Sequence, residues 1–225
     1  MMRAPISVVI PTLNAGASLH GSLACLMEGV EAGVIREVII SDGGSTDQTI
    51  ALAKDWGAEI VSGPASRGGQ LQRGCAAAQG AWLLVLHADT QLSPGWVGPV
   101  MRHMQGRKAG WFQLAFDKGG LPAKIVAGWA NWRSRRGLPY GDQGLFLLRD
   151  MYEVVGGYVD QPLMEDVAMA RALKGQLAPI DVVAITSAQK YQSQGWMRRG
   201  GRNLLVLLRY SFGADVETLA RSYRK

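Results

Sequence analysis

Acidic residues that follow apolar runs are the positions in this 225-residue chain where chemistry could take place. Asp42 ends one such run and precedes Gly-Gly-Ser-Thr-Asp, where glycines let the backbone come close to a ligand. A carboxylate at this position could accept the ring N–H of a pyrimidine base. The alternative is that the motif only caps the next helix through Ser45 or Thr46.

Asp89 follows the strongly apolar segment 82–86. A carboxylate oxygen suits Mg²⁺ or Mn²⁺, which share oxygen ligands with phosphates and can neutralise the charge on a departing diphosphate. His87 lies two residues earlier, so in an extended chain it points to the same side. Three roles stay open for His87: a second metal ligand, a hydrogen-bond donor to phosphate, or a capped loop residue.

Two further acidic positions lie in the second half of the chain. Glu165 and Asp166 begin a helical pattern, where adjacent carboxylates either interact with the helix dipole or supply a general base for an attacking hydroxyl. Asp142 lies in a turn between Gly141 and Gly144. This aspartate could bind sugar hydroxyls or be an ordinary turn residue.

The elements that must position these residues are four short apolar runs with helical segments between them, at residues 6–10, 35–40, 58–61 and 82–86. The runs are mostly apolar rather than alternating, which is typical of strands buried on both faces. Strands interleaved with helices predict a parallel, doubly wound α/β sheet. The intervening helices are expected to end near Glu28, Trp56 and Gln79.

In such a sheet ligands bind outside the carboxyl ends of the strands. That edge carries Asn14, Asp42 and Asp89, together with the loop of Arg67 and Gln70. Arg67 and Gln70 either contact a nucleotide and its phosphates or form solvated surface.

The second half has a less regular pattern. We expect helices at 94–103, 121–136 and 165–173, and strands at 111–116, 145–148 and 180–185. The chain is interpreted as one domain over residues 1–225. Within it, residues 5–92 form a nucleotide-binding half, residues 93–190 an acceptor half, and residues 191–225 a helical C-terminal segment.

Composition narrows the class of protein. The net charge of +6 suits an anionic ligand such as a diphosphate, and no nucleic-acid-binding motif is present. We read Cys25 and Cys75 as buried free thiols, and the N-terminus does not resemble a secretory signal. Both features favour a reducing cytoplasm. No apolar run reaches the ~18 residues of a transmembrane helix.

The segment Trp196–Phe212 carries four arginines, no acidic residue and the run 204–208, Leu-Leu-Val-Leu-Leu. Two interpretations stay open. The segment packs on the domain or in a homodimer interface, or it lies as an interfacial helix on an anionic membrane. The second would add peripheral contact with the inner face of the membrane to a cytoplasmic location.

Four motifs together resemble family 2 glycosyltransferases of the GT-A fold, and the resemblance covers about residues 5–190. They are Val8–Asn14, Ser41–Asp47, His87–Asp89 and Glu165–Asp166, in this order. The resemblance implies an α/β, Rossmann-like, doubly wound mixed sheet in three α/β/α layers. The chain is also similar to the radical-SAM/selenodomain-associated glycosyltransferase subgroup, through Gly137–Gly144 and Pro162–Asp166.

The resemblance implies inverting transfer of a single sugar from a nucleoside-diphosphate sugar, with a UDP-sugar favoured, to an unspecified hydroxyl acceptor. Asp89 would hold Mg²⁺ or Mn²⁺, with His87 as a candidate second ligand, and Asp166 would be the catalytic base. The implied nucleotide-binding residues are Pro11, Thr12, Asn14, Asp42, Arg67, Gln70 and Ala88. The implied acceptor-binding residues are Tyr140, Asp142, Gln143 and Glu165.

Three positions depart from the family pattern. Ala15 stands where the family often has glutamate, and His87 replaces the first aspartate of the Asp-x-Asp metal motif. The Gln-x-x-Arg-Trp motif of processive members is missing, since Gln194-Gly195-Trp196 does not reproduce it. The third departure favours single-sugar transfer over polymer synthesis.

Two rival functions stay open. A nucleotidyltransferase would make the sugar nucleotide, but it usually has a glycine-rich basic loop after the first strand, and residues 11–16 contain no basic residue. A non-catalytic nucleotide-binding relative is compatible with Ala15 and His87. A dinucleotide-dependent dehydrogenase is disfavoured, because no Gly-x-Gly-x-x-Gly follows the first strand.

Overall fold

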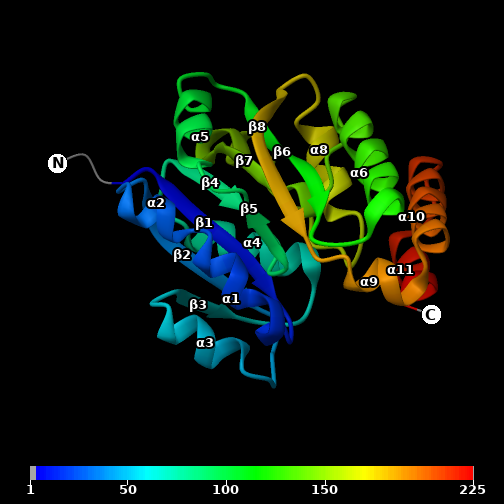
Figure 1. Cartoon of the computed structure of the whole chain (residues 1–225), viewed down its shortest axis with the longest axis horizontal. Helices are drawn as coiled ribbons and strands as arrows, with labels where there is room; N and C mark the ends of the chain where they lie inside the picture. Colours follow the sequence, from blue (N-terminus) through cyan, green and yellow to red (C-terminus); the bar gives the residue numbers. More distant parts are fainter. Residues whose placement is uncertain (1–3, 225) are drawn as a thin grey trace.

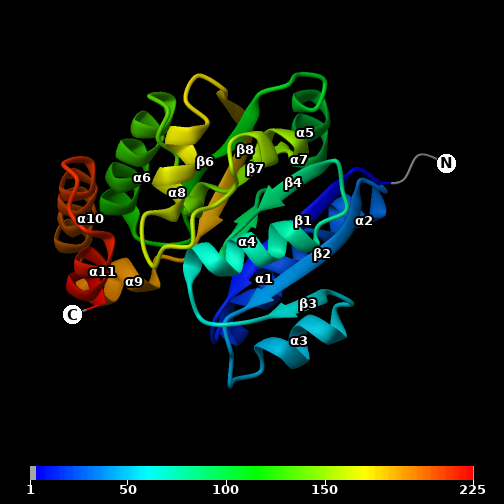
Figure 2. The same cartoon turned by 180° about the vertical axis from the view of Figure 1, so that it is seen from behind.

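One eight-stranded sheet runs through both halves of the chain (Figure 1). The computed structural model describes residues 4–224. The strand order is β3-β2-β1-β4-β7-β6-β8-β5, and helices cover both faces of the sheet, as the view from behind also shows (Figure 2). The structure therefore confirms the α/β class and the three-layer arrangement.

The first half forms the parallel part of the sheet. Its strands are β1 (Ile6–Thr12), β2 (Ile35–Asp42), β3 (Glu59–Ser62) and β4 (Trp82–Val85). β1 pairs in parallel with β2 and β4, and β2 pairs in parallel with β3, as the apolar runs predict. The helices are α1 (Gly16–Ala24), α2 (Met27–Glu31), α3 (Thr49–Asp55) and α4 (Arg67–Ala77). The expected first helix is thus two helices, interrupted at residues 25–26.

The second half makes the sheet mixed. Its strands are β5 (Thr90–Leu92), β6 (Ala109–Phe116), β7 (Leu145–Leu148) and β8 (Leu177–Thr186). β7 lies between β4 and β6 and is antiparallel to both, whereas β6 and β8 are parallel. β5 closes the far edge, antiparallel to β8. A mixed sheet is what the family resemblance implies.

The remaining helices surround this half. They are α5 (Val97–His103), α6 (Gly120–Arg135), α7 (Arg149–Val154), α8 (Glu165–Ala172), α9 (Gln189–Gln194), α10 (Trp196–Ser211) and α11 (Val216–Arg224), with a 3₁₀ turn, η1, at Gly141–Gln143. Strand β5 and helix α7 were not predicted from the sequence, whereas α9 and α11 were expected only as part of the helical C-terminal segment 191–225. Elements this short span too few residues to show a clear hydrophobic period.

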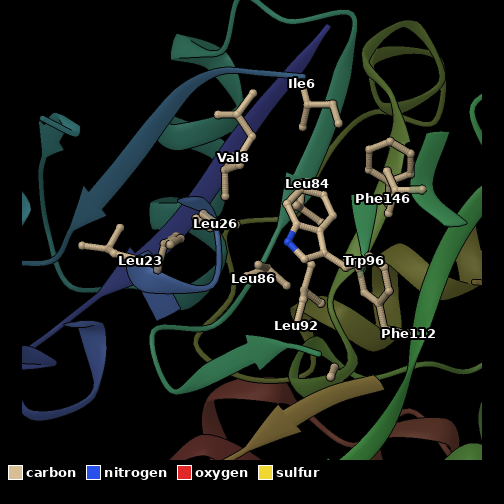
Figure 3. Close-up of a cluster of buried hydrophobic side chains, with 14 of the residues drawn as sticks. Ile6, Val8, Leu23, Leu26, Leu84, Leu86, Leu92, Trp96, Phe112 and Phe146 are labelled. Carbon is tan, nitrogen blue, oxygen red and sulfur yellow. The ribbon is translucent and has the colours of Figure 1, made fainter. Parts of the chain in front are cut away.

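Strand β1 explains why its apolar run is continuous. Successive side chains of a strand point to opposite faces, and Val8 and Val9 pack in two different buried clusters. Figure 3 shows the Val8 side of the sheet, where Leu84, Trp96 and Phe146 belong to the same cluster. Both faces of β1 are therefore excluded from water, and the polar ends of the strands are left to face ligands.

Two smaller expectations concern thiols and membranes. Cys25 and Cys75 are both free thiols, as expected, but only Cys75 is fully buried and Cys25 is half-buried. Across residues 4–224, no helix is long and apolar enough to cross a membrane.

Candidate functional site

The loops that follow β1 and β2 are joined by hydrogen bonds. The Thr12 hydroxyl donates to Oδ1 of Asp42 at 2.9 Å, and the Thr46 backbone N–H donates to Oδ1 of Asn14 at 2.9 Å. Asn14 has a φ of 50°, a left-handed conformation that asparagine tolerates better than most residues. Gln70 donates from Nε2 to the carbonyl oxygens of Thr12 and Ser41, at 2.7 and 3.0 Å. These bonds fix the carboxyl ends of both strands.

Asp42 is engaged within its own loop. Oδ2 accepts from the N–H groups of Gly44 and Ser45, each at 2.8 Å, and Oδ1 accepts from the Ser45 hydroxyl at 2.6 Å. Burial opposes ionisation of this carboxyl, but the bonds from Ser45, Thr12 and Gly44 outweigh it and lower the pKa of Asp42. Since α3 begins only at Thr49, Asp42 organises the loop rather than capping the helix.

A cavity of 830 Å³ opens above these loops, within the usual range for ligand pockets. Nine of the predicted site residues line it: Pro11, Thr12, Asn14, Arg67, Gln70, His87, Ala88, Asp89 and Glu165. Asp42 is not among the lining residues, because its carboxylate is turned into the loop. The carboxyl edge of the parallel strands thus holds most of the predicted nucleotide-binding set.

A smaller cavity of 130 Å³ adjoins the first. Tyr140, Asp142 and Asp166 line it, and it shares Arg67 and Asp89 with the larger one. Gln143 lines neither cavity. It is fully buried, donates from Nε2 to the Phe112 carbonyl at 3.2 Å and accepts from Ser134. Gln143 therefore holds the η1 turn from inside.

Arg67 lines both cavities and contacts residues from both halves of the chain. Its Nε donates to Oε1 of Glu165 at 2.7 Å, and Nη2 lies 3.1 Å from Nε2 of His87. Burial, together with the charge of Arg67, lowers the pKa of His87 to about 4. The imidazole is therefore neutral at pH 7, and its Nε2 accepts from the guanidinium. This nitrogen is directed at Arg67 rather than toward a metal.

The two members of the acidic pair, Glu165 and Asp166, have different partners. Glu165 is buried, and burial raises the pKa of its carboxyl although Arg67 opposes the rise. Asp166 accepts from the Gly141 N–H at 2.8 Å through Oδ2, and from the Val167 N–H at 2.7 Å through Oδ1. Met164, just before the pair, has a φ of 62°. A left-handed conformation in a non-glycine residue costs about 1–3 kcal/mol, so the turn that leads into Glu165 and Asp166 is strained.

Asp142 is the least satisfied group of the smaller cavity. Its Oδ1 is buried and has no hydrogen-bond partner, and burial raises the pKa of Asp142 to about 6. Its neighbour Tyr140 lies under the Arg133 guanidinium, 3.3 Å from the ring centroid. An unpaired buried acceptor is costly, so a ligand hydroxyl that donates to Asp142 would remove that cost.

The donor set around Asp89 is compatible with a hard cation. Its carboxylate faces both cavities, and the Lys190 ammonium lies 3.9 Å from Oδ2, so this oxygen already attracts positive charge. Within residues 4–224, no three His, Cys, Asp or Glu side chains gather to hold a metal ion by themselves. Oxygen ligands from a diphosphate would have to complete the coordination.

One wall of the smaller cavity was not predicted from the sequence. Five residues of the C-terminal helices line it: Lys190, Tyr191, Arg199, Asn203 and Tyr223. They come from α9, α10 and α11. The available signal was the segment of arginines with no acidic partner, which we interpreted only as a packing or membrane feature.

A mixed Rossmann-like sheet, with acidic residues and an arginine lining a cavity at its carboxyl edge, is the arrangement that the resemblance to GT-A glycosyltransferases implies. The chain belongs to glycosyl transferase family 2, whose family model matches residues 7–145. PGL/p-HBAD biosynthesis glycosyltransferases of Mycobacterium tuberculosis and Mycobacterium bovis are 34% identical over 99 residues. That match covers 40% of this chain and only 38% of theirs.

Several solved structures of glycosyltransferases share the fold. Glucosyl-3-phosphoglycerate synthase from Mycobacterium tuberculosis, in complex with Mn²⁺, UDP and glucosyl-3-phosphoglycerate, has a TM-score of 0.63 at 19% identity, over 94% of this chain and 81% of that one. Mannosyltransferase PcManGT from Pyrobaculum calidifontis, in complex with GDP-Man and Mn²⁺, has a TM-score of 0.66 at 19% identity, over 92% and 63%. At these identities the likeness concerns the fold alone.

Proposed function

We propose that this chain is an inverting glycosyltransferase that moves one sugar from a nucleoside-diphosphate sugar, with a UDP-sugar favoured, to a hydroxyl acceptor. One observation carries the proposal. Asp166 lines the smaller cavity, and Asp89 and Arg67 line both this cavity and the larger, nucleotide-sized one. A sugar bound between the two cavities would therefore have the proposed base, Asp166, on one side and the proposed phosphate-binding residues, Arg67 and Asp89, on the other.

The nucleotide would occupy the 830 Å³ cavity. Six residues of its wall are proposed to contact the nucleoside diphosphate: Pro11, Thr12, Asn14, Arg67, Gln70 and Ala88. Asp42 keeps the loops in shape, and it would contact the base only by exchanging one of its present hydrogen bonds. The guanidinium of Arg67 is half-exposed and can bind a phosphate oxygen while it stays paired with Glu165.

Asp89 would hold a divalent cation, Mn²⁺ or Mg²⁺, together with diphosphate oxygens. Such a cation, when bound, neutralises charge on the departing diphosphate. His87 could join only through Nδ1, since Nε2 accepts from Arg67. Two similar enzymes have been solved in complex with Mn²⁺, which supports Mn²⁺ as the cation.

On the acceptor side, Asp166 would take the proton of the attacking hydroxyl. The bond from the Gly141 N–H holds one carboxylate oxygen in place, and general-base assistance typically contributes ~10²–10⁴-fold in rate. Tyr140 and Asp142 would bind acceptor or sugar hydroxyls. Glu165 and Gln143 would position this group, Glu165 through Arg67 and Gln143 through the η1 turn.

We also propose a role for each of three segments of the chain. Residues 5–92 would bind the nucleotide, residues 93–190 the acceptor, and residues 191–225 would complete that side, all in one domain. Single-sugar transfer, a cytoplasmic location and membership of the radical-SAM/selenodomain-associated subgroup also rest on sequence only.

Product analysis with UDP-sugars and Mn²⁺ tests the proposal. We expect release of UDP and free or transferred sugar, and loss of Mn²⁺-dependent thermal stabilisation by UDP in Asp89→Ala. Release of pyrophosphate would favour the nucleotidyltransferase instead. If the wild-type protein binds UDP but turns over none of the UDP-sugars, it is a non-catalytic nucleotide-binding relative.

A further inference from the structure

Two neighbouring helices, α6 and α10, leave apolar side chains exposed on the outer edge of the molecule. Both views place them side by side, with α10 outermost (Figures 1 and 2). The exposed residues of α6 are Leu121, Ile125, Trp129 and Trp132. Those of α10, with Phe212 just after it, are Met197, Leu204, Leu205, Leu208 and Phe212. We call these nine residues the apolar edge.

Their spacing makes each set a stripe along its helix. In α6 the exposed apolar residues recur every three or four positions, so they share one face, while Ala123 and Ala130 are buried on the other. In α10 the same spacing aligns Met197, Leu204 and Leu208, and Val206 and Leu207 are buried against the protein. Each helix therefore has two apolar sides: one packs against the protein, and the other has no partner among the described residues.

The two stripes adjoin. Leu121 and Ile125 line a cavity of 390 Å³ together with Met197, at one end of the helices. A second cavity brings Trp129 of α6 next to Leu204 of α10. The exposed fractions reach 82% for Met197 and 89% for Phe212, so the apolar edge is a continuous surface rather than scattered single residues.

Basic residues surround this surface, and acidic residues are missing from its segments. Residues 118–141 contain five basic residues and no acidic one, and residues 187–214 contain another five and no acidic one. Five of the basic side chains are exposed on α6 and α10 or at the end of α6: Lys124, Arg135, Arg136, Arg198 and Arg209. Exposed apolar side chains flanked by cations complement an anionic lipid surface.

The apolar edge lies directly behind the acceptor side of the site. A small cavity of 40 Å³ is lined by Tyr140 and Asp142, and also by Trp129 and Leu204 of the apolar edge. α10 also supplies Asn203 to the wall of the smaller site cavity. One helix thus borders the site with one face and carries the exposed stripe on another.

We propose that the apolar edge docks on an anionic bilayer and that the acceptor is an amphiphile whose hydroxyl group is presented at that surface. The acceptor class rests on the proposed glycosyl transfer, whereas docking does not. Trp129 and Trp132 stack at 4.9 Å, and Arg136 lies 4.0 Å over the Trp132 ring. Such amphipathic rings are favoured at the level of lipid headgroups.

Vesicle sedimentation tests docking without any substrate. Wild-type protein should bind vesicles of phosphatidylcholine mixed with phosphatidylglycerol and should be released by salt. Leu205→Glu/Leu208→Glu should abolish binding, and Arg198→Gln/Arg209→Gln should weaken it by about 10- to 30-fold. The matched control Val154→Glu, on a remote exposed residue of α7, should bind as wild type.

UDP-induced thermal stabilisation with Mn²⁺ separates the two proposals, since all these variants lie away from the nucleotide cavity and should retain it. Absence of vesicle binding by wild-type protein, equal binding to pure phosphatidylcholine, or a dimer that Leu208→Glu dissociates would overturn docking while leaving glycosyl transfer intact. Transfer to water-soluble acceptors as fast as to lipid-bound ones would overturn the acceptor class.

Discussion

Arg67 and Glu165 are 98 positions apart in the chain, and the guanidinium Nε of the first donates to the carboxylate of the second at 2.7 Å. The pair joins the first turn of α4 to the first turn of α8. It therefore connects the parallel half of the sheet to the acidic pair Glu165–Asp166.

Removal of one member of this pair should destabilise the fold. Arg67→Gln leaves Glu165 buried without its cation, and we expect a loss of about 1–2 kcal/mol in the free energy of unfolding, reduced from the value for fully buried pairs because Arg67 is half-exposed. Urea denaturation measures it. Arg67→Gln/Glu165→Gln should recover part of the loss. If the two single losses simply add, the pair is not coupled.

Asp166→Asn should separate binding from transfer. The amide can still accept from the Gly141 N–H but cannot take a proton, so we expect turnover to fall by about 10²–10⁴-fold with little change in calorimetric affinity for UDP and Mn²⁺. Asp150→Asn, on an exposed aspartate of α7, is the control. Near-normal turnover in Asp166→Asn would remove Asp166 from the base role.

Asp142 should make stability depend on pH. Its pKa is about 6 in the folded protein and near 3.8 when exposed, so between these values the native state binds more protons than the unfolded state. Stability contributed by the protonated carboxyl is therefore present near pH 4 and is lost as the pH rises through 6, by about 2–3 kcal/mol. Asp142→Asn should lack this slope in urea titrations with EDTA. Parallel profiles for the two proteins would contradict it.

Gly141→Ala should disturb the site without unfolding it. A Cβ at Gly141 would collide with the His87 imidazole, so either that ring or the η1 turn that holds Asp166 must move. We expect turnover to fall by about tenfold, because small displacements of reacting groups are costly, while the melting temperature changes little. Gly128→Ala, where the added carbon meets open space, is the matched control. Equal activities of the two variants would show that the close approach is unimportant.

The first half of the fold could be predicted from sequence because β1 and β4 are buried on both faces, and their apolar runs are interrupted only by the buried Ser7 of β1. That pattern also located Asp89 at the carboxyl edge. The role of Asp42 could not be read in the same way. Whether a carboxylate faces a ligand or its own loop depends on where Thr12 and Ser45 direct their hydroxyls, which no spacing encodes.

The second half was predicted less completely for a related reason. Lys190 and Asn203 reach the cavity from α9 and α10, more than 90 positions after Asp89, and only the packing of the C-terminal helices brings them there. Likewise, the neutral state of His87 follows from burial beside Arg67, a contact between residues on different elements. Neither the approach of the C-terminal helices to the cavity nor the contact between His87 and Arg67 can be read from local sequence.

The antiparallel insertion of β7 between β4 and β6 has a consequence for synthesis of the protein. On the ribosome, β4 is complete at residue 85, but its second neighbour emerges only with residues 145–148. Throughout that interval, one side of β4 presents unpaired peptide groups, which can recruit a strand from another nascent chain. Slow translation of the interval between residues 85 and 145 should therefore increase aggregation.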